Sequence, residues 1–151
     1  MVFRVCKMFE IASGHMLHKH PGRCRFPHGH TRRVEVVVSA QELDANDMVC
    51  DFKALKWAVL ECVDRLDHAM AINSQDPSLK GLLETKDRLV VFQDQDPTTE
   101  VLAKHIYESV CRRIGTTFAG DGVSYHLPAS LVVDRVRVSE TSTTWAEYGR
   151  A

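Results

Sequence analysis

The stretch CRFPHGHTRRVEVVVSA, residues 24–40, joins a histidine-rich turn to a valine-rich segment. Side chains on a strand alternate between its two faces with a period of two residues. Val34, Val36 and Val38 share one face, whereas Arg33 and Glu35 lie on the other. The segment therefore predicts a half-buried strand that begins close behind the second histidine of the turn.

Similar patterns extend outward from this strand in both directions. Asp51 and Pro97 are residue types that start helices, and Gly115 is one that ends them. Apolar residues recur with helical spacing after Asp51 and Pro97, and they alternate in the remaining segments. The predicted elements, in chain order, are a strand over 2–11, a strand over 32–40, a helix over 52–66, a helix over 97–114, and strands over 130–140 and 143–149.

This order of two strands, two helices and two strands favours the α+β class. We expect one four-stranded antiparallel sheet with both helices on one face, in a single domain over residues 1–151. The connection over residues 69–95 is long for a compact domain, and such a connection is either functional or mobile.

Composition limits the function classes. Nineteen basic and twenty acidic side chains nearly cancel, without a block of one sign, so charge suggests neither nucleic acid nor membrane lipid as the main partner. No apolar run approaches the roughly twenty residues of a membrane-spanning helix. Five cysteines without a C-x-x-C spacing suit reduced thiols in a reducing compartment. We expect a soluble, cytoplasmic protein.

Three histidines suggest a metal site. His28 and His30 are separated by one residue, so in an extended segment they project to the same side. His15 follows the first predicted strand and would meet this pair if the two strands are neighbours. Three imidazoles leave the fourth position of a tetrahedral zinc open, which is the arrangement of catalytic zinc.

Other interpretations of these histidines remain open at this point. An isolated H-x-H is an ordinary loop sequence, and His18 with His20 forms a second such pair. Proline and glycine follow that second pair and indicate a flexible loop, which favours the pair that leads into the strand.

Cys24 and the Asp67–His68 pair add acid–base chemistry. Three roles are open for the Cys24 thiol. It is a fourth zinc ligand, or a base or nucleophile whose thiolate form is favoured by nearby cations, or a half-buried free thiol. Asp67 can orient the His68 imidazole and stabilise its protonated form, which permits a proton relay to Cys24. The alternative for this pair is a cap or surface pair at the end of a helix.

Carboxylate and hydroxyl side chains complete the candidates. Glu140 continues the inward parity of its strand, which implies a ligand or partner for a buried acid, unless the strand ends at Ser139 and the side chain turns to solvent. On pattern alone, Thr98 and Thr99 are ordinary residues of the first turn of the second helix.

The chain resembles the 6-pyruvoyltetrahydropterin synthase / 6-carboxytetrahydropterin synthase family over nearly its whole length. The resemblance rests on six segments in the order of the family, which are specific as a set. They are FEIASGH ending at His15, CRFPHGH, MVCDFKALK, LDHAMAIN, DPTTEVLAKHI and SETSTTWAEY.

The resemblance implies the T-fold, in subunits that assemble as trimers or hexamers, and a pterin triphosphate substrate. By similarity, His15, His28 and His30 would hold Zn²⁺. Cys24 would accept the proton, and Asp67 with His68 would relay it. Glu140 would bind the pyrimidine edge of the pterin, with Thr98 and Thr99 as further substrate contacts.

Two activities share this machinery. The carboxy enzymes convert 7,8-dihydroneopterin triphosphate to 6-carboxytetrahydropterin, release acetaldehyde and triphosphate, and supply queuosine synthesis. The pyruvoyl enzymes only eliminate triphosphate. The C-x-x-x-H-G-H spacing from Cys24 to His28 resembles that of the bacterial carboxy branch. Met16 stands where many members of the family carry a basic residue after the first histidine. A catalytically silent T-fold that binds a pterin or purine is a third possibility.

Overall fold

Two strands of thirteen residues each form the centre of the main sheet. Strand β1, Phe3–His15, pairs antiparallel with β2, His28–Ala40, in a register without interruption from Phe3 opposite Ala40 to His15 opposite His28. The valine parity of β2 is buried beneath the helices. Strand β2 is thus the half-buried strand that its alternation predicts. Its register with β1 places the end of β1 beside the start of β2.

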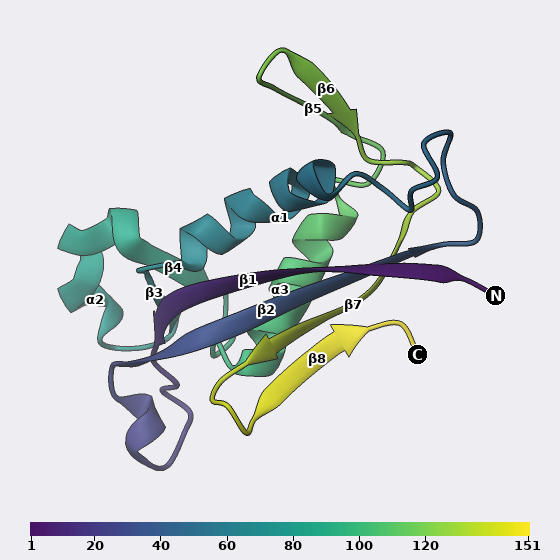
Figure 1. Cartoon of the computed structure of the whole chain (residues 1–151). Helices are drawn as coiled ribbons and strands as arrows, with labels where there is room; N and C mark the ends of the chain where they lie inside the picture. The colour runs from purple at the N-terminus through teal and green to yellow at the C-terminus, as the bar shows by residue number, and fades with distance from the viewer.

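The computed structural model describes residues 1–151 and contains eight strands. Six of them form the main sheet in the order β4-β3-β1-β2-β7-β8, and β5 with β6 forms a separate two-stranded sheet (Figure 1). The other strand bounds are β3 Met70–Asn73, β4 Leu89–Phe92, β5 Thr117–Gly120, β6 Val123–His126, β7 Val132–Ser139 and β8 Trp145–Gly149.

The helices begin at the capping residues that the sequence offers. In α1, Phe52–Leu66, the Asp51 carboxylate accepts the Lys53 amide hydrogen. In α3, Thr99–Cys111, the Thr98 hydroxyl accepts the Val101 amide hydrogen. The shorter elements are α2, Leu79–Leu82, and two 3₁₀ helices, η1 at Arg23–Arg25 and η2 at Leu83–Arg88.

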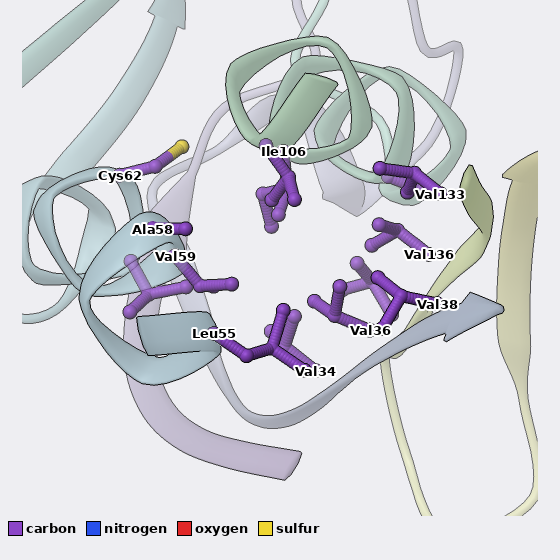
Figure 2. Close-up of a cluster of buried hydrophobic side chains, with 14 of the residues drawn as sticks. Val34, Val36, Val38, Leu55, Ala58, Val59, Cys62, Ile106, Val133 and Val136 are labelled. Carbon is purple, nitrogen blue, oxygen red and sulfur yellow. The ribbon is translucent and has the colours of Figure 1, made fainter. Parts of the chain in front are cut away.

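The hydrophobic core lies between the sheet and the two long helices. Figure 2 shows valines of β2 and β7 facing α1 and α3, within a cluster of 24 buried residues. Val34 and Val36 are fully buried against Leu55 and Ile106. Each such side chain contributes about 1.5–3 kcal/mol through its burial. The core therefore anchors the strand that carries two of the candidate histidines.

The predicted α+β class is confirmed, but the predicted four-stranded antiparallel ββααββ sheet is wrong. The connection over residues 69–95 supplies two more strands, and β3 pairs in parallel with both β1 and β4. Each of these strands has only four residues, which is too short for an alternating pattern to stand out. The mixed sheet therefore ends in a short parallel pair.

The hairpin β5–β6 also lies outside the predicted elements and projects beyond α1 (Figure 1). Its turn contains Asp121 with φ 53° and Gly122 with φ 73°. Two positive φ values favour an Asp-Gly pair, so this dipeptide was the available hairpin signal. The Tyr125 ring packs edge-on against Trp57 of α1, with 5.4 Å between the ring centroids.

Candidate metal centre and active site

The end of β1 and the start of β2 bring three histidines together. His15 lies opposite His28, and His30 lies opposite Ser13, so all three imidazoles occupy the helix-facing side of the sheet. One nitrogen from each ring lies within 4.8 Å of the others. A side chain at Gly29 would place its Cβ 3.2 Å from the Ser13 carbonyl oxygen, so glycine permits the close strand contact.

Hydrogen bonds orient two of these rings. The Nδ1 atoms of His15 and His28 each lie 2.8 Å from a backbone carbonyl oxygen, that of Pro97 and that of Phe26 respectively. A carbonyl oxygen accepts only, so each Nδ1 carries the hydrogen and the lone pair of each ring is on Nε2. The Nε2 atoms of His28 and His30 are buried without a hydrogen-bond partner. Converging, unpartnered nitrogens of this kind fit a divalent metal ion.

Burial keeps His15 neutral. Desolvation, together with the smaller effect of the Arg32 charge, lowers the pKa of His15 to about 4, although the hydrogen bond to the Pro97 carbonyl opposes this shift. Desolvation and the same charge lower the pKa of His30. A metal ion binds the neutral imidazole, so His15 does not have to release a proton at pH 7.

Glu140 directly follows the last residue of β7, and its carboxylate is turned toward the histidines. Its Oε1 lies 3.3 Å from Nε2 of His30 and 3.7 Å from Nε2 of His15, although the side chain is 34% exposed. The strand thus ends at Ser139, yet the acid does not point away into solvent. Glu140 is placed to contact a ligand beside the three imidazoles.

Arg32 is a residue of this region that the sequence interpretation missed. Its side chain is fully buried, and it donates from Nε to Ser13 Oγ and from Nη1 to Thr99 Oγ1, each at 3.0 Å. Its Nη2 lies 3.3 Å from both ring nitrogens of His15. Arg32 has the same parity as His28, His30 and the buried valines, which was the signal that it points inward.

The two threonines at the start of α3 are engaged within the chain. Thr98 is the N-cap, and its hydroxyl oxygen accepts the Val101 amide hydrogen at 3.3 Å. Thr99 is buried, and its hydroxyl accepts from Arg32. Each hydroxyl therefore retains its own hydrogen as the group available to a ligand.

Asp67 and His68 directly follow α1 and lie on an exposed rim. Asp67 Oδ1 accepts the Ala12 amide hydrogen at 2.8 Å, and Oδ2 lies 3.1 Å from His68 Nδ1. The hydrogen bond from the Ala12 backbone amide, followed by the contact with His68, holds the pKa of Asp67 below its usual range. His68 adopts φ 54°, and its side chain is 78% exposed.

No hydrogen bond joins the Cys24 thiol to Asp67 or His68. Cys24 is in η1, its side chain is partly exposed, and its thiol forms no disulfide. The competing histidine pair does not converge either. His18 Nε2 lies 3.8 Å from Asp96, whereas His20 Nδ1 accepts the Gly22 amide hydrogen. The structure therefore brings together His15, His28, His30 and Glu140, whereas Cys24 makes no hydrogen bond with Asp67 or His68.

Comparison with known proteins identifies the family. The family model described as 6-pyruvoyl tetrahydropterin synthase matches residues 4–151. The chain belongs to this family. It is 29% identical to the 6-carboxy-5,6,7,8-tetrahydropterin synthase of Aquifex aeolicus over 98% of each chain. It is 32% identical to the Bacillus subtilis protein of the same name, over 97% of this chain and 84% of the relative.

Solved structures support the fold of this family member. An uncharacterized protein from Wolinella succinogenes superposes with a TM-score of 0.81 at 22% identity, covering 100% of this chain and 99% of the other. The Caenorhabditis elegans 6-pyruvoyl tetrahydropterin synthase superposes with a TM-score of 0.69 at 16% identity, covering 100% and 97%. Both likenesses concern the fold alone.

None of the helices combines the length and the apolar character needed to span a membrane.

Proposed function

We propose that this family member is a zinc-dependent 6-carboxytetrahydropterin synthase. Its substrate would be 7,8-dihydroneopterin triphosphate, which reacts with water to give 6-carboxytetrahydropterin, acetaldehyde and triphosphate. The observation that carries the proposal is the convergence of three imidazoles beside Glu140. The names of the Aquifex aeolicus and Bacillus subtilis relatives support the choice of product.

The proposed site divides into a metal end and a pterin end. His15, His28 and His30 would hold the zinc ion, which when bound stabilises negative charge on the oxygens of the substrate side chain. Glu140 would accept hydrogen bonds from the N–H groups of the pyrimidine ring, which matches its position beside the histidines. Thr98 and Thr99 are proposed to contribute further substrate contacts.

Two side chains are proposed to move protons, and a third orients one of them. Cys24 would take a proton from the substrate side chain as its thiolate, and His68 would exchange a proton with the reacting carbons. The Asp67 carboxylate would orient the His68 ring through their 3.1 Å contact. These roles need Cys24 and His68 on opposite sides of one substrate molecule, so they are compatible with a site that two subunits share.

A turnover assay tests the proposed function. The zinc-loaded protein is incubated with dihydroneopterin triphosphate, and acetaldehyde and the pterin product are measured together. Acetaldehyde with 6-carboxytetrahydropterin supports the proposal. Pyruvoyltetrahydropterin without acetaldehyde would assign the pyruvoyl activity instead, and no turnover would indicate a catalytically silent pterin- or purine-binding protein.

Replacement of Cys24 tests its role separately. We expect Cys24→Ala to lower kcat by about 10²–10⁴-fold, the usual contribution of general acid–base catalysis, with zinc still near one ion per chain. Cys6→Ala is the matched control, because Cys6 is an exposed thiol of β1. Loss of zinc in Cys24→Ala would make this cysteine a structural ligand.

We also propose that residues 1–151 act as one T-fold domain in the cytoplasm and assemble as a homotrimer or hexamer. Strands β4 and β8 are the two edges of the main sheet, and unpaired edges favour pairing with another chain. Light scattering after gel filtration would measure the assembly. A role in queuosine synthesis would be tested by restoring queuosine to the tRNA of a bacterium that lacks its own 6-carboxytetrahydropterin synthase.

A further inference from the structure

A hollow of about 550 Å³ lies beside the proposed proton relay, at the end of the β1–β2 pair that carries the candidate histidines. Its lining includes both His30 and His68, together with Arg88 from the end of η2. The inference drawn from it rests on the proposed function, whose substrate carries a triphosphate leaving group. We propose that Arg88 binds this triphosphate in the hollow, with Thr31 as a second donor.

Strand pairing brings Arg88 to this place. Leu89, the first residue of β4, lies opposite Met70 of β3, and Met70 also pairs with Gly14 of β1. Arg88 precedes Leu89 by one residue, and His68 precedes Met70 by two. In a parallel pair, residues at equal offsets lie side by side, so Arg88 lies beside Ala69, the residue that directly follows His68. The connection over residues 69–95 thus supplies a cation beside the proposed active site.

The charge of Arg88 is free to meet an anion. No hydrogen bond or ion pair within the chain uses its guanidinium, and no carboxylate is among the residues that line the hollow. Asp67, whose carboxylate feels the Arg88 charge, is already engaged by Ala12 and His68, and that charge is the smallest cause given for its lowered pKa. A guanidinium in this state suits bidentate binding of phosphate oxygens.

Two threonines have different parts in the hollow. Thr31 is exposed there, and its hydroxyl forms no hydrogen bond within the chain, so it can donate to a phosphate oxygen. The Thr85 hydroxyl instead donates to the Leu82 carbonyl oxygen at 2.8 Å. That bond closes the turn that leads to Arg88, which makes Thr85 a positioning residue.

The other large hollows suit an anion less well. The one beside Arg25 contains Asp76, which is 5% exposed with an unpartnered Oδ2 that would repel phosphate. The one between β1, β2, β7 and β8 contains two glutamates, and its Arg137 pairs with Glu147. The one near the chain ends, of about 930 Å³, touches none of the proposed site residues, and its Arg4 pairs with Asp134.

The test measures phosphate binding separately from pterin binding. Arg88→Met should weaken the binding of inorganic tripolyphosphate and raise KM for dihydroneopterin triphosphate, each by roughly tenfold or more, as expected for a lost charge-assisted contact. Binding of unphosphorylated dihydroneopterin should stay within about twofold. Arg88→Lys should retain part of the phosphate affinity, because it keeps the charge but loses the bidentate geometry.

Lys86→Met is the matched control. Lys86 lies in the same 3₁₀ helix but does not line the hollow, so its loss removes one positive charge without removing the contact. The inference is overturned if Arg88→Met leaves tripolyphosphate binding and KM unchanged, or if Lys86→Met weakens both to the same degree. Thermal melting of each variant verifies that it is folded.

The outcomes also separate this inference from the proposed function. A wild-type protein that turns over the substrate while Arg88→Met has no effect retains the proposed function and loses the subsite. A wild-type protein that binds tripolyphosphate through Arg88 without any turnover retains the subsite and loses the proposed function.

Discussion

The metal end and the relay end of the proposed site are built differently. His15 is fully buried, and its ring is held by the carbonyl of Pro97, whereas His68 is 78% exposed and contacts one carboxylate. The three imidazoles of the metal end converge within one chain, and the relay end is open on the rim of the sheet. The difference indicates that the fold alone positions the proposed metal ligands, while the proposed proton transfer depends on what covers the rim.

The largest effect should come from breaking the metal end. We expect His28→Ala to reduce bound zinc to near zero and turnover by about 10³-fold or more, because a catalytic metal contributes several kcal/mol of charge stabilisation. Metal content is measured by mass spectrometry after dialysis. His20→Ala is the control from the competing histidine pair, and the assignment is wrong if this variant loses the metal and His28→Ala keeps it.

A smaller effect should come from breaking the relay end. Asp67→Asn keeps an oxygen for the Ala12 amide and removes only the charge, so kcat should fall on the order of 100-fold with zinc content unchanged. The pKa of Asp67 is lowered, so the carboxylate is ionised at every pH above its unfolded value of about 3.9. The ratio of wild-type to variant kcat should therefore be constant from pH 6 to 8.

Because its pKa is lower in the folded chain, the ionised Asp67 carboxylate also stabilises the folded state. This contribution to the free energy of unfolding is present above the unfolded pKa and is lost as the pH falls through the lower, folded pKa. A ratio that changes strongly between pH 6 and 8 would show that another group titrates in place of Asp67.

The smallest of these effects concerns the buried cation behind the metal end. Arg32→Gln should lower the free energy of unfolding by about 1–3 kcal/mol, because the hydroxyls of Ser13 and Thr99 lose a donor. Metal affinity should rise, since a positive charge near the ion is removed. Chemical denaturation and competitive metal titration measure the two quantities. Arg33→Gln, on the exposed face of β2, should change neither, and weaker metal binding in Arg32→Gln would contradict this explanation.

Much of the metal end could be predicted from the sequence. The period-two alternation around Val34 and Val36 fixes which face is buried, and the H-x-H spacing then places His28 and His30 on that face. The neighbouring positions of the first two strands bring in His15. These are local rules, and the structure obeys them because both strands are long.

The remainder of the site depends on contacts that no local rule contains. Strands β3 and β4 have four residues each, so their place in the sheet comes from the pairing of β3 with β1 and of β4 with β3 rather than from their own pattern. That pairing is also what brings Arg88 to His68. Arg32 could be placed on the inner face by parity, but its partners Ser13 and Thr99 lie on other elements.

The position of Arg88 has a consequence for how such an enzyme can evolve. Residues 74–88 connect β3 to β4 at the outer edge of the sheet, away from the β1–β2 pairing that holds the histidines. Insertions, deletions and substitutions there leave the proposed metal ligands in register. Under the proposed roles, natural variation in this connection can therefore change which substrate tails are accepted while the metal site is inherited intact.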